Sequence, residues 1–210
     1  NNGVIGFRVT GAVTPGNVPG EWFFGAYNNH DVDPYLSGNV RMVVQSTGNV
    51  GIGTITPSYK LQVNADASFN DVRVGRGNGN VISNLALGNG TLNANTTGDW
   101  NTAAGMQSLS VNTTGYSNTA IGFQSQSANT GGFDNTSTGA QSLLVNSTGS
   151  QNTANGYAAL QLNETGSSNT ATGSAALGDN VSGSYNTAIG KYALLTNQYG
   201  NYNTAIGYYA

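Results

Sequence analysis

Residues 169–185 read NTATGSAALGDNVSGSY, and residues 186–202 read NTAIGKYALLTNQYGNY. The two stretches have the same length, and Asn, Thr, Ala, Gly and Leu recur at the same places in both. The pattern repeats every 17 residues from Asn84 onward without an insertion. A fixed period of this kind is typical of repeat proteins, in which each unit stacks on its neighbours.

Each unit is numbered here from position 1 to position 17, starting at its first asparagine. The first asparagine column, at position 1, contains Asn84, Asn101, Asn118, Asn135, Asn152, Asn169, Asn186 and Asn203. A first glycine column follows at position 5, from Gly88 to Gly207. The second asparagine column is at position 12, from Asn95 to Asn197, and the second glycine column is at position 15, from Gly98 to Gly200.

Two further columns are apolar, and each has one exception. Position 3 is alanine in every unit except at Ser137, and position 9 is leucine except at Gln126. The unit therefore contains two short segments, T-A-x and x-(A/S)-L-x-x, each bounded by Gly and Asn, which are residues that favour turns. Glycine recurs too often for a helix, so we expect short β-like segments.

The strict period predicts an all-β fold, a parallel β-solenoid with 17-residue coils. Successive coils would stack at the strand spacing of about 4.8 Å, so that each column forms a line along the axis. Stacked asparagines can then hydrogen-bond from coil to coil through their side-chain amides. The alternation of a strand places the alanine column on one face and the flanking Thr and Ile or Leu on the other.

The coil is thin, and this suggests an oligomer. One coil contributes little more than an alanine and a leucine to an apolar interior, and a small core seldom offsets the conformational entropy lost on folding. Several identical chains around one axis would bury a second face. We therefore expect a homotrimer.

The units beginning at Asn186 and Asn203, with NTAIG and NTAIGY, resemble repeats of bacteriophage tail fibres and related bacterial fibre proteins. They are also similar to the head repeats of trimeric autotransporter adhesins. Residues 46–54 and 57–61 resemble a segment found before such repeats in tail fibres. The resemblance implies a left-handed β-roll, a trimer and an extracellular place on a virion or a bacterial surface. The 17-residue period is longer than the adhesin coil.

Residues 1–80 differ from the repeats and predict a small β domain or collar, followed by the solenoid at 81–210. Short strands are expected at 4–9, 21–27, 40–44 and 61–63, between Gly, Pro and Asn turns. The alternation of apolar and polar residues at 67–74 predicts one half-exposed strand.

Composition excludes several partners. Six basic residues and a net charge of −3 are a poor match for nucleic acid or anionic lipid. No apolar run approaches the roughly 20 residues that span a bilayer, and the absence of cysteine rules out disulfides and thiolate metal sites. Because the chain begins at Asn1 and ends within a repeat, we expect it to be part of a longer protein.

No catalytic, cofactor or metal site is expected, and we expect the protein not to be an enzyme. His30 is the one histidine and lies in a polar loop with Asp31 and Asp33, which could contribute to a calcium site but lack further carboxylates. The glycine clusters at 48–53 and 75–79 resemble phosphate loops, yet no helical pattern follows either, so we interpret them as turns. The pair Gly190-Lys191 lacks the other residues of a P-loop. The glycosylation sequon Asn95-Thr96-Thr97 and its counterparts in later units arise from the repeat itself.

Aromatic residues gather at a few places in the unit and could seal contacts between chains or stack on the sugar rings of a host glycan. They occupy positions 16 and 17 or follow the first glycine: Trp100, Tyr116, Phe133, Tyr185 and Tyr202, and Phe123, Tyr157, Tyr192, Tyr208 and Tyr209.

These observations favour a structural and adhesive segment of a trimeric fibre, such as a phage tail fibre, with a host or surface receptor or glycan as a further partner. A bacterial cell-surface adhesin or filament is the alternative. An ice-binding solenoid is less favoured, because the threonine column from Thr102 to Thr204 has a mixed neighbouring column. A polysaccharide-degrading tail spike is also less favoured, because Asp99, Asp134, Glu164 and Asp179 occupy different columns.

Overall fold

A computed structural model describes residues 8–9, 22–24, 42–45, 47–54 and 56–210 of the chain. The chain divides into two compact units, residues 1–65 and 66–210. We expected the small β domain to extend to residue 80, whereas residues 66–80 lie in the same compact unit as the repeats. No α-helix occurs in the described ranges.

The N-terminal unit contains a five-stranded sheet in the order β1-β2-β3-β4-β5. Pairing is antiparallel except between β4 and β5, which run parallel. The strands are β1 (Arg8–Val9), β2 (Trp22–Phe24), β3 (Met42–Val44), β4 (Val50–Ile52) and β5 (Leu61–Val63). The predicted strands are confirmed where the structure describes them, and the rest of those stretches lies outside the described residues. Strand β4 lies within the glycine cluster that we interpreted as a turn.

The second unit begins with a hairpin of β6 (Ala67–Phe69) and β7 (Val72–Gly75). The prediction of one strand over 67–74 is wrong because Asn70 and Asp71 have φ values of 48° and 63° and reverse the chain. Two central residues with positive φ form the turn that best matches the twist of a hairpin, and Asn and Asp tolerate this conformation. A 3-10 turn at Asn78–Asn80 then leads into the repeats.

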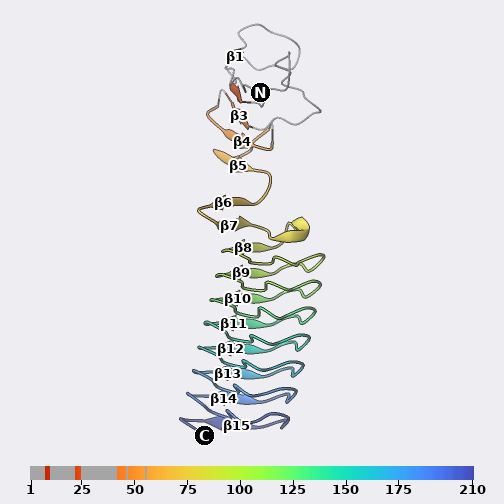
Figure 1. The fold of residues 1–210 in the computed structure, drawn as a ribbon, viewed down its shortest axis with the longest axis vertical. Helices are drawn as coiled ribbons and strands as arrows, with labels where there is room; N and C mark the ends of the chain where they lie inside the picture. The colour runs from red at the N-terminus through yellow and green to blue at the C-terminus, as the bar shows by residue number, and fades with distance from the viewer. Residues whose placement is uncertain (1–7, 10–21, 25–41, 46, 55) are drawn as a thin grey trace, which may run out of the picture. The chain divides into compact units, whose positions relative to one another are not determined.

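The repeats form a parallel β-solenoid, as predicted. Eight strands stack one per coil: β8 (Leu85–Leu87), β9 (Thr102–Ala104), β10 (Thr119–Ile121), β11 (Thr136–Thr138), β12 (Thr153–Asn155), β13 (Thr170–Thr172), β14 (Thr187–Ile189) and β15 (Thr204–Ile206) (Figure 1). Each residue pairs with the one 17 positions later, in all seven parallel pairings. The period of the sequence is therefore the length of one coil.

The strand alternates as expected. The middle residue, which is Ala in seven of the eight strands, is buried in β8 to β14. The residue before it, which is Leu85 in β8 and Thr in the other strands, and the residue after it lie on the outer face with partial or full exposure. The alanine column therefore faces the interior of the coil. A small side chain at this place lets the strand pack closely against the opposite wall of the coil.

The second segment of the unit is not a strand, in contrast to our expectation. It forms consecutive turns, and the residue at position 9 has a φ between 45° and 51° in every unit. This left-handed conformation costs roughly 1–2 kcal/mol for a residue with a side chain. The leucines from Leu92 to Leu177 are nevertheless fully buried, so their burial, worth about 1.5–3 kcal/mol each, offsets the strained backbone.

Both asparagine columns form hydrogen-bonded ladders, as predicted. In the second column each Nδ2 donates to the Oδ1 of the asparagine one coil earlier, at 2.7–2.9 Å from Asn112 to Asn180. In the first column Oδ1 accepts from the backbone N–H of the next asparagine, at 2.8–3.1 Å. These buried amides stay satisfied only while the coils remain in register.

The two ladders meet at the second glycine column. The carbonyl oxygen of Gly132 accepts one N–H from Asn118 at 2.8 Å and one from Asn129 at 3.1 Å, and the other units repeat this pattern. A Cβ built on Gly132 would lie 2.4 Å from the Gly149 oxygen and 2.5 Å from Asn129 Oδ1. Glycine is therefore required here by close approach rather than by its dihedral angles.

The two exceptions in the apolar columns touch each other. Gln126 Nε2 donates to Ser137 Oγ at 2.8 Å and to the Thr119 carbonyl at 3.1 Å, and Ser125 Oγ also contacts Ser137 Oγ. This polar layer separates two apolar clusters, one spanning 86–120 and the other 143–193. Among the described residues, two buried side-chain atoms lack a partner, Gln126 Oε1 and Asn180 Oδ1.

Restoring the consensus in this layer should stabilise the solenoid. We expect the free energy of unfolding of the Gln126→Leu/Ser137→Ala variant to be about 1–3 kcal/mol higher than that of the natural chain. The reason is that the variant removes an unpaired buried acceptor and joins the two apolar clusters. Ser137→Ala alone should destabilise, since Gln126 Nε2 then loses a partner. Chemical denaturation of the three proteins tests this, and a double variant less stable than the natural chain would contradict it.

Candidate functional site

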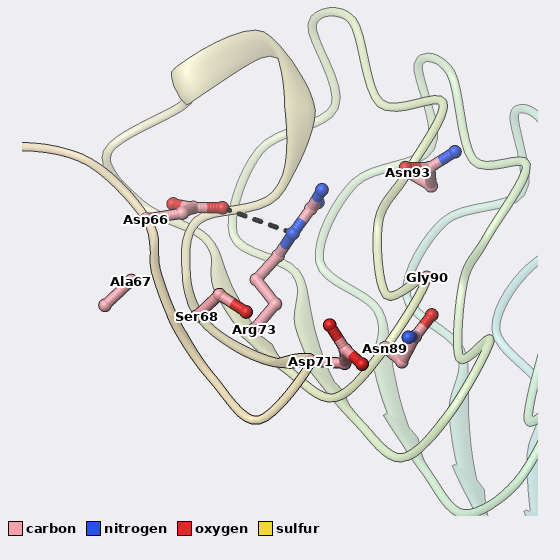
Figure 2. Close-up of a pocket in the computed structure, with 8 residues that line it drawn as sticks. All are labelled: Asp66, Ala67, Ser68, Asp71, Arg73, Asn89, Gly90 and Asn93. Carbon is pink, nitrogen blue, oxygen red and sulfur yellow. Dashed lines mark ion pairs between the residues drawn. The ribbon is translucent and has the colours of Figure 1, made fainter.

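A pocket of about 500 Å³ lies between the β6–β7 hairpin and the first coil (Figure 2). The hairpin side is formed by Asp66, Ala67, Ser68, Asp71 and Arg73, and the coil side by Asn89, Gly90 and Asn93. Both sides belong to the unit 66–210. The volume falls within the range of small-molecule sites, roughly 300–1,000 Å³.

One wall of the pocket is held rigidly. Asp66 accepts backbone N–H groups from Arg76 at 2.6 Å and Gly77 at 3.0 Å, and its Oδ2 lies 3.6 Å from Arg73 Nε. Arg73 Nη1 donates to the Thr91 carbonyl of the first coil at 3.1 Å. The hydrogen bond to Thr91 therefore links the hairpin to the first coil, and the ion pair with Asp66 neutralises the guanidinium charge.

The remaining polar groups are available to a ligand. Within the described part of the chain, the side chains of Ser68, Asp71, Asn89 and Asn93 form no hydrogen bond with one another or with a neighbour. All four residues are exposed. Figure 2 shows Asp71 beside Asn89, with Asn93 on the far side of Gly90. The pocket thus offers one carboxylate, two carboxamides and one hydroxyl.

Our reading of the sequence missed this pocket because it depends on a tertiary contact between the hairpin and a coil. The columns carry no signal of it. Asn89, Gly90 and Asn93 occupy positions 6, 7 and 10 of the first unit, and these positions also vary among the later units.

The structure places the candidate site residues from the sequence in several different settings. His30, Asp31 and Asp33 lie outside the described residues. The glycines at 48–53 and 75–79 flank or lie within strands β4 and β7 and the 3-10 turn, and no α-helix follows them in the described ranges. The sequon asparagines from Asn95 to Asn180 are buried, and their side-chain nitrogens donate within the ladder. A glycan on these nitrogens is incompatible with the folded coil.

The aromatic columns stack along the chain itself. The ring centroids of Tyr116 and Phe133 are 4.9 Å apart, and the ring planes are 1° from parallel. The ring centroids of Tyr185 and Tyr202 are 5.0 Å apart, and the ring planes are 3° from parallel. The separation matches the spacing of the coils. Each ring of a pair therefore covers one face of its neighbour in the same chain, which leaves one face and the edges for any contact with a sugar or another chain.

The outer face of the sheet carries no charge. At positions 2 and 4 of β8–β15 the side chains are Thr, Ala, Ile, Leu and Asn, and the charged residues of the repeats are at other positions. Leu85, Leu87, Ile121, Ile189 and Ile206 are between 42% and 70% exposed. The threonine column forms one regular line, while its neighbour mixes aliphatic residues with Thr and Asn.

The carboxylates of the repeats remain dispersed. Asp99, Asp134, Glu164 and Asp179 occupy positions 16, 17, 13 and 11 of different units. In the described part of the chain, no group of three or more His, Asp or Glu side chains could hold a metal ion.

No protein-family model, curated protein or solved structure matches the chain. Within the described residues, no helix has the length and apolar character needed to cross a membrane.

Proposed function

We propose that the chain is a structural and adhesive segment of a trimeric extracellular fibre, of the kind found in phage tail fibres. The observation that carries the proposal is the uncharged, regular outer face of β8–β15. Two copies of this face have the same coil spacing, so the threonine column and the mixed aliphatic and polar column beside it on one chain can meet the same columns on another. Aliphatic side chains that are half exposed in one chain would be buried by this contact.

The thin interior supports the same proposal. The apolar clusters consist mainly of Ala and Leu, and buried asparagines fill much of the remaining space. Burying a second face between chains would add apolar contacts that one chain lacks. The resemblance of the NTAIG units to tail-fibre and adhesin repeats favours three chains, and the ladders would make each chain a stiff spacer.

A lysine on the outer face tests the assembly. We expect the natural protein to be a trimer by light scattering and Ile121→Lys to shift it to monomer, because the ammonium group would be buried without a partner. Phe123→Lys is the matched control, since Phe123 is similarly exposed and Lys191 occupies the same position of a later unit. A natural protein that is a stable monomer would overturn the trimer, and equal effects of both variants would place the interface elsewhere.

A further inference from the structure

We propose that the pocket between the hairpin and the first coil binds an uncharged saccharide. Among the described residues, the β6–β7 hairpin pairs with the solenoid at its first strand, β8, so this contact of hairpin and coil is not repeated at the later strands. The asparagine, glycine and threonine columns, by contrast, recur with the period of the coil. The hollow beside the hairpin is therefore a place where the solenoid departs from its periodic columns and can recognise a ligand.

The polar groups in the pocket select the chemical class of the ligand. Asp71 accepts hydrogen bonds, Asn89 and Asn93 both donate and accept, and Ser68 has a hydroxyl that does either. A ligand that satisfies all of them must itself combine donors and acceptors. Sugar hydroxyls have this property, and a saccharide ring with its substituents fits a cavity of about 500 Å³.

Charged ligands match the pocket less well. The guanidinium of Arg73 is paired with Asp66, and Asp71 adds a negative charge, so a phosphate or a carboxylate would meet a site of net negative charge. A divalent cation would find one unpaired carboxylate, because Asp66 is held by two backbone N–H groups and by Arg73. Calcium sites use several oxygen ligands, often with more than one carboxylate.

The site rests on a rigid support. Arg73 bridges Asp66 and the Thr91 carbonyl, which fixes the hairpin against the coil. The turn at Asn70 and Asp71 places Asp71 among the residues that line the pocket. The backbone that carries the polar groups is therefore held in place before a ligand binds, and the entropy lost on binding is mainly that of the exposed side chains.

Saturation-transfer NMR with glucose, galactose, mannose and N-acetylglucosamine as probes tests the proposal on the full chain. We expect transfer to at least one sugar and about a tenfold weaker affinity for Asp71→Asn, since the variant replaces a hydrogen bond to a charged carboxylate with a weaker bond to a neutral amide. Asn tolerates the positive φ of this turn, so the hairpin should persist. Asp134→Asn is the matched control, an exposed aspartate with φ of 53° and far from the pocket in sequence.

Three results would overturn the proposal. They are the absence of transfer from all four sugars at millimolar concentration, equal affinity of Asp71→Asn and the natural chain, and binding of calcium alone in a titration without sugar. The proposal rests on the adhesive role inferred above, but the pocket lies within one chain. A trimer that binds no sugar would overturn the pocket alone, and a monomer that binds sugar would overturn the trimer alone.

Discussion

Leu160→Asp is expected to unfold the central coils. Leu160 is fully buried in the cluster that extends from Leu143 to Ala193. Replacing it removes about 1.5–3 kcal/mol of apolar burial and places an unpaired carboxylate in the interior, which costs several kcal/mol more. The sum approaches the whole stability of an ordinary domain, about 5–15 kcal/mol. Circular dichroism and the melting temperature of the variant check this expectation.

Leu162→Asp is the matched control. Leu162 lies in the same coil, is 40% exposed, and occupies the position at which the next unit already has Asp179. The same substitution should therefore leave the melting temperature within a few degrees of the natural value. If both variants melted alike, the leucine column would not form the interior.

Removal of residues 152–168 should leave a folded protein that is one coil shorter. The deletion joins Gln151 to Asn169, so every column continues in phase. The Gln126–Ser137 contact is retained, because both residues precede the deletion. We expect the rod to shorten by about 4.8 Å, the spacing of one strand. Small-angle scattering of the natural and shortened proteins measures the difference.

Removal of residues 152–159 alone should prevent folding. This deletion shifts the later asparagines, glycines and alanines out of their columns, so the amides at 0–2% exposure lose their partners in the ladder. The second glycine column would also face residues with a Cβ, at places where Gly166 and Gly183 leave no room for one. A folded eight-residue deletion would show that the 17-residue period is not the physical unit of the solenoid.

The sequence by itself determined the coil. Because the columns recur without an insertion, stacking the coils one period apart places identical residues above one another. This stacking sets the parallel register, buries the alanine column and forms the asparagine ladders. Local turn preferences also placed most described strands of the N-terminal unit correctly. These features depend on residues close in sequence or exactly one period apart, and a pattern of spacing reveals both.

Three other features could be learned only from the tertiary structure, because they depend on contacts between residues that the 17-residue period does not relate. The leucines adopt a left-handed backbone since burial in a narrow coil outweighs its cost. Gln126 and Ser137, eleven residues apart, meet because the interior brings the turn of one coil beside the strand of the next. The pocket exists because the pairing of β7 with β8 and the hydrogen bond from Arg73 to Thr91 hold the hairpin against the first coil, which brings Asn89 and Asn93 next to it.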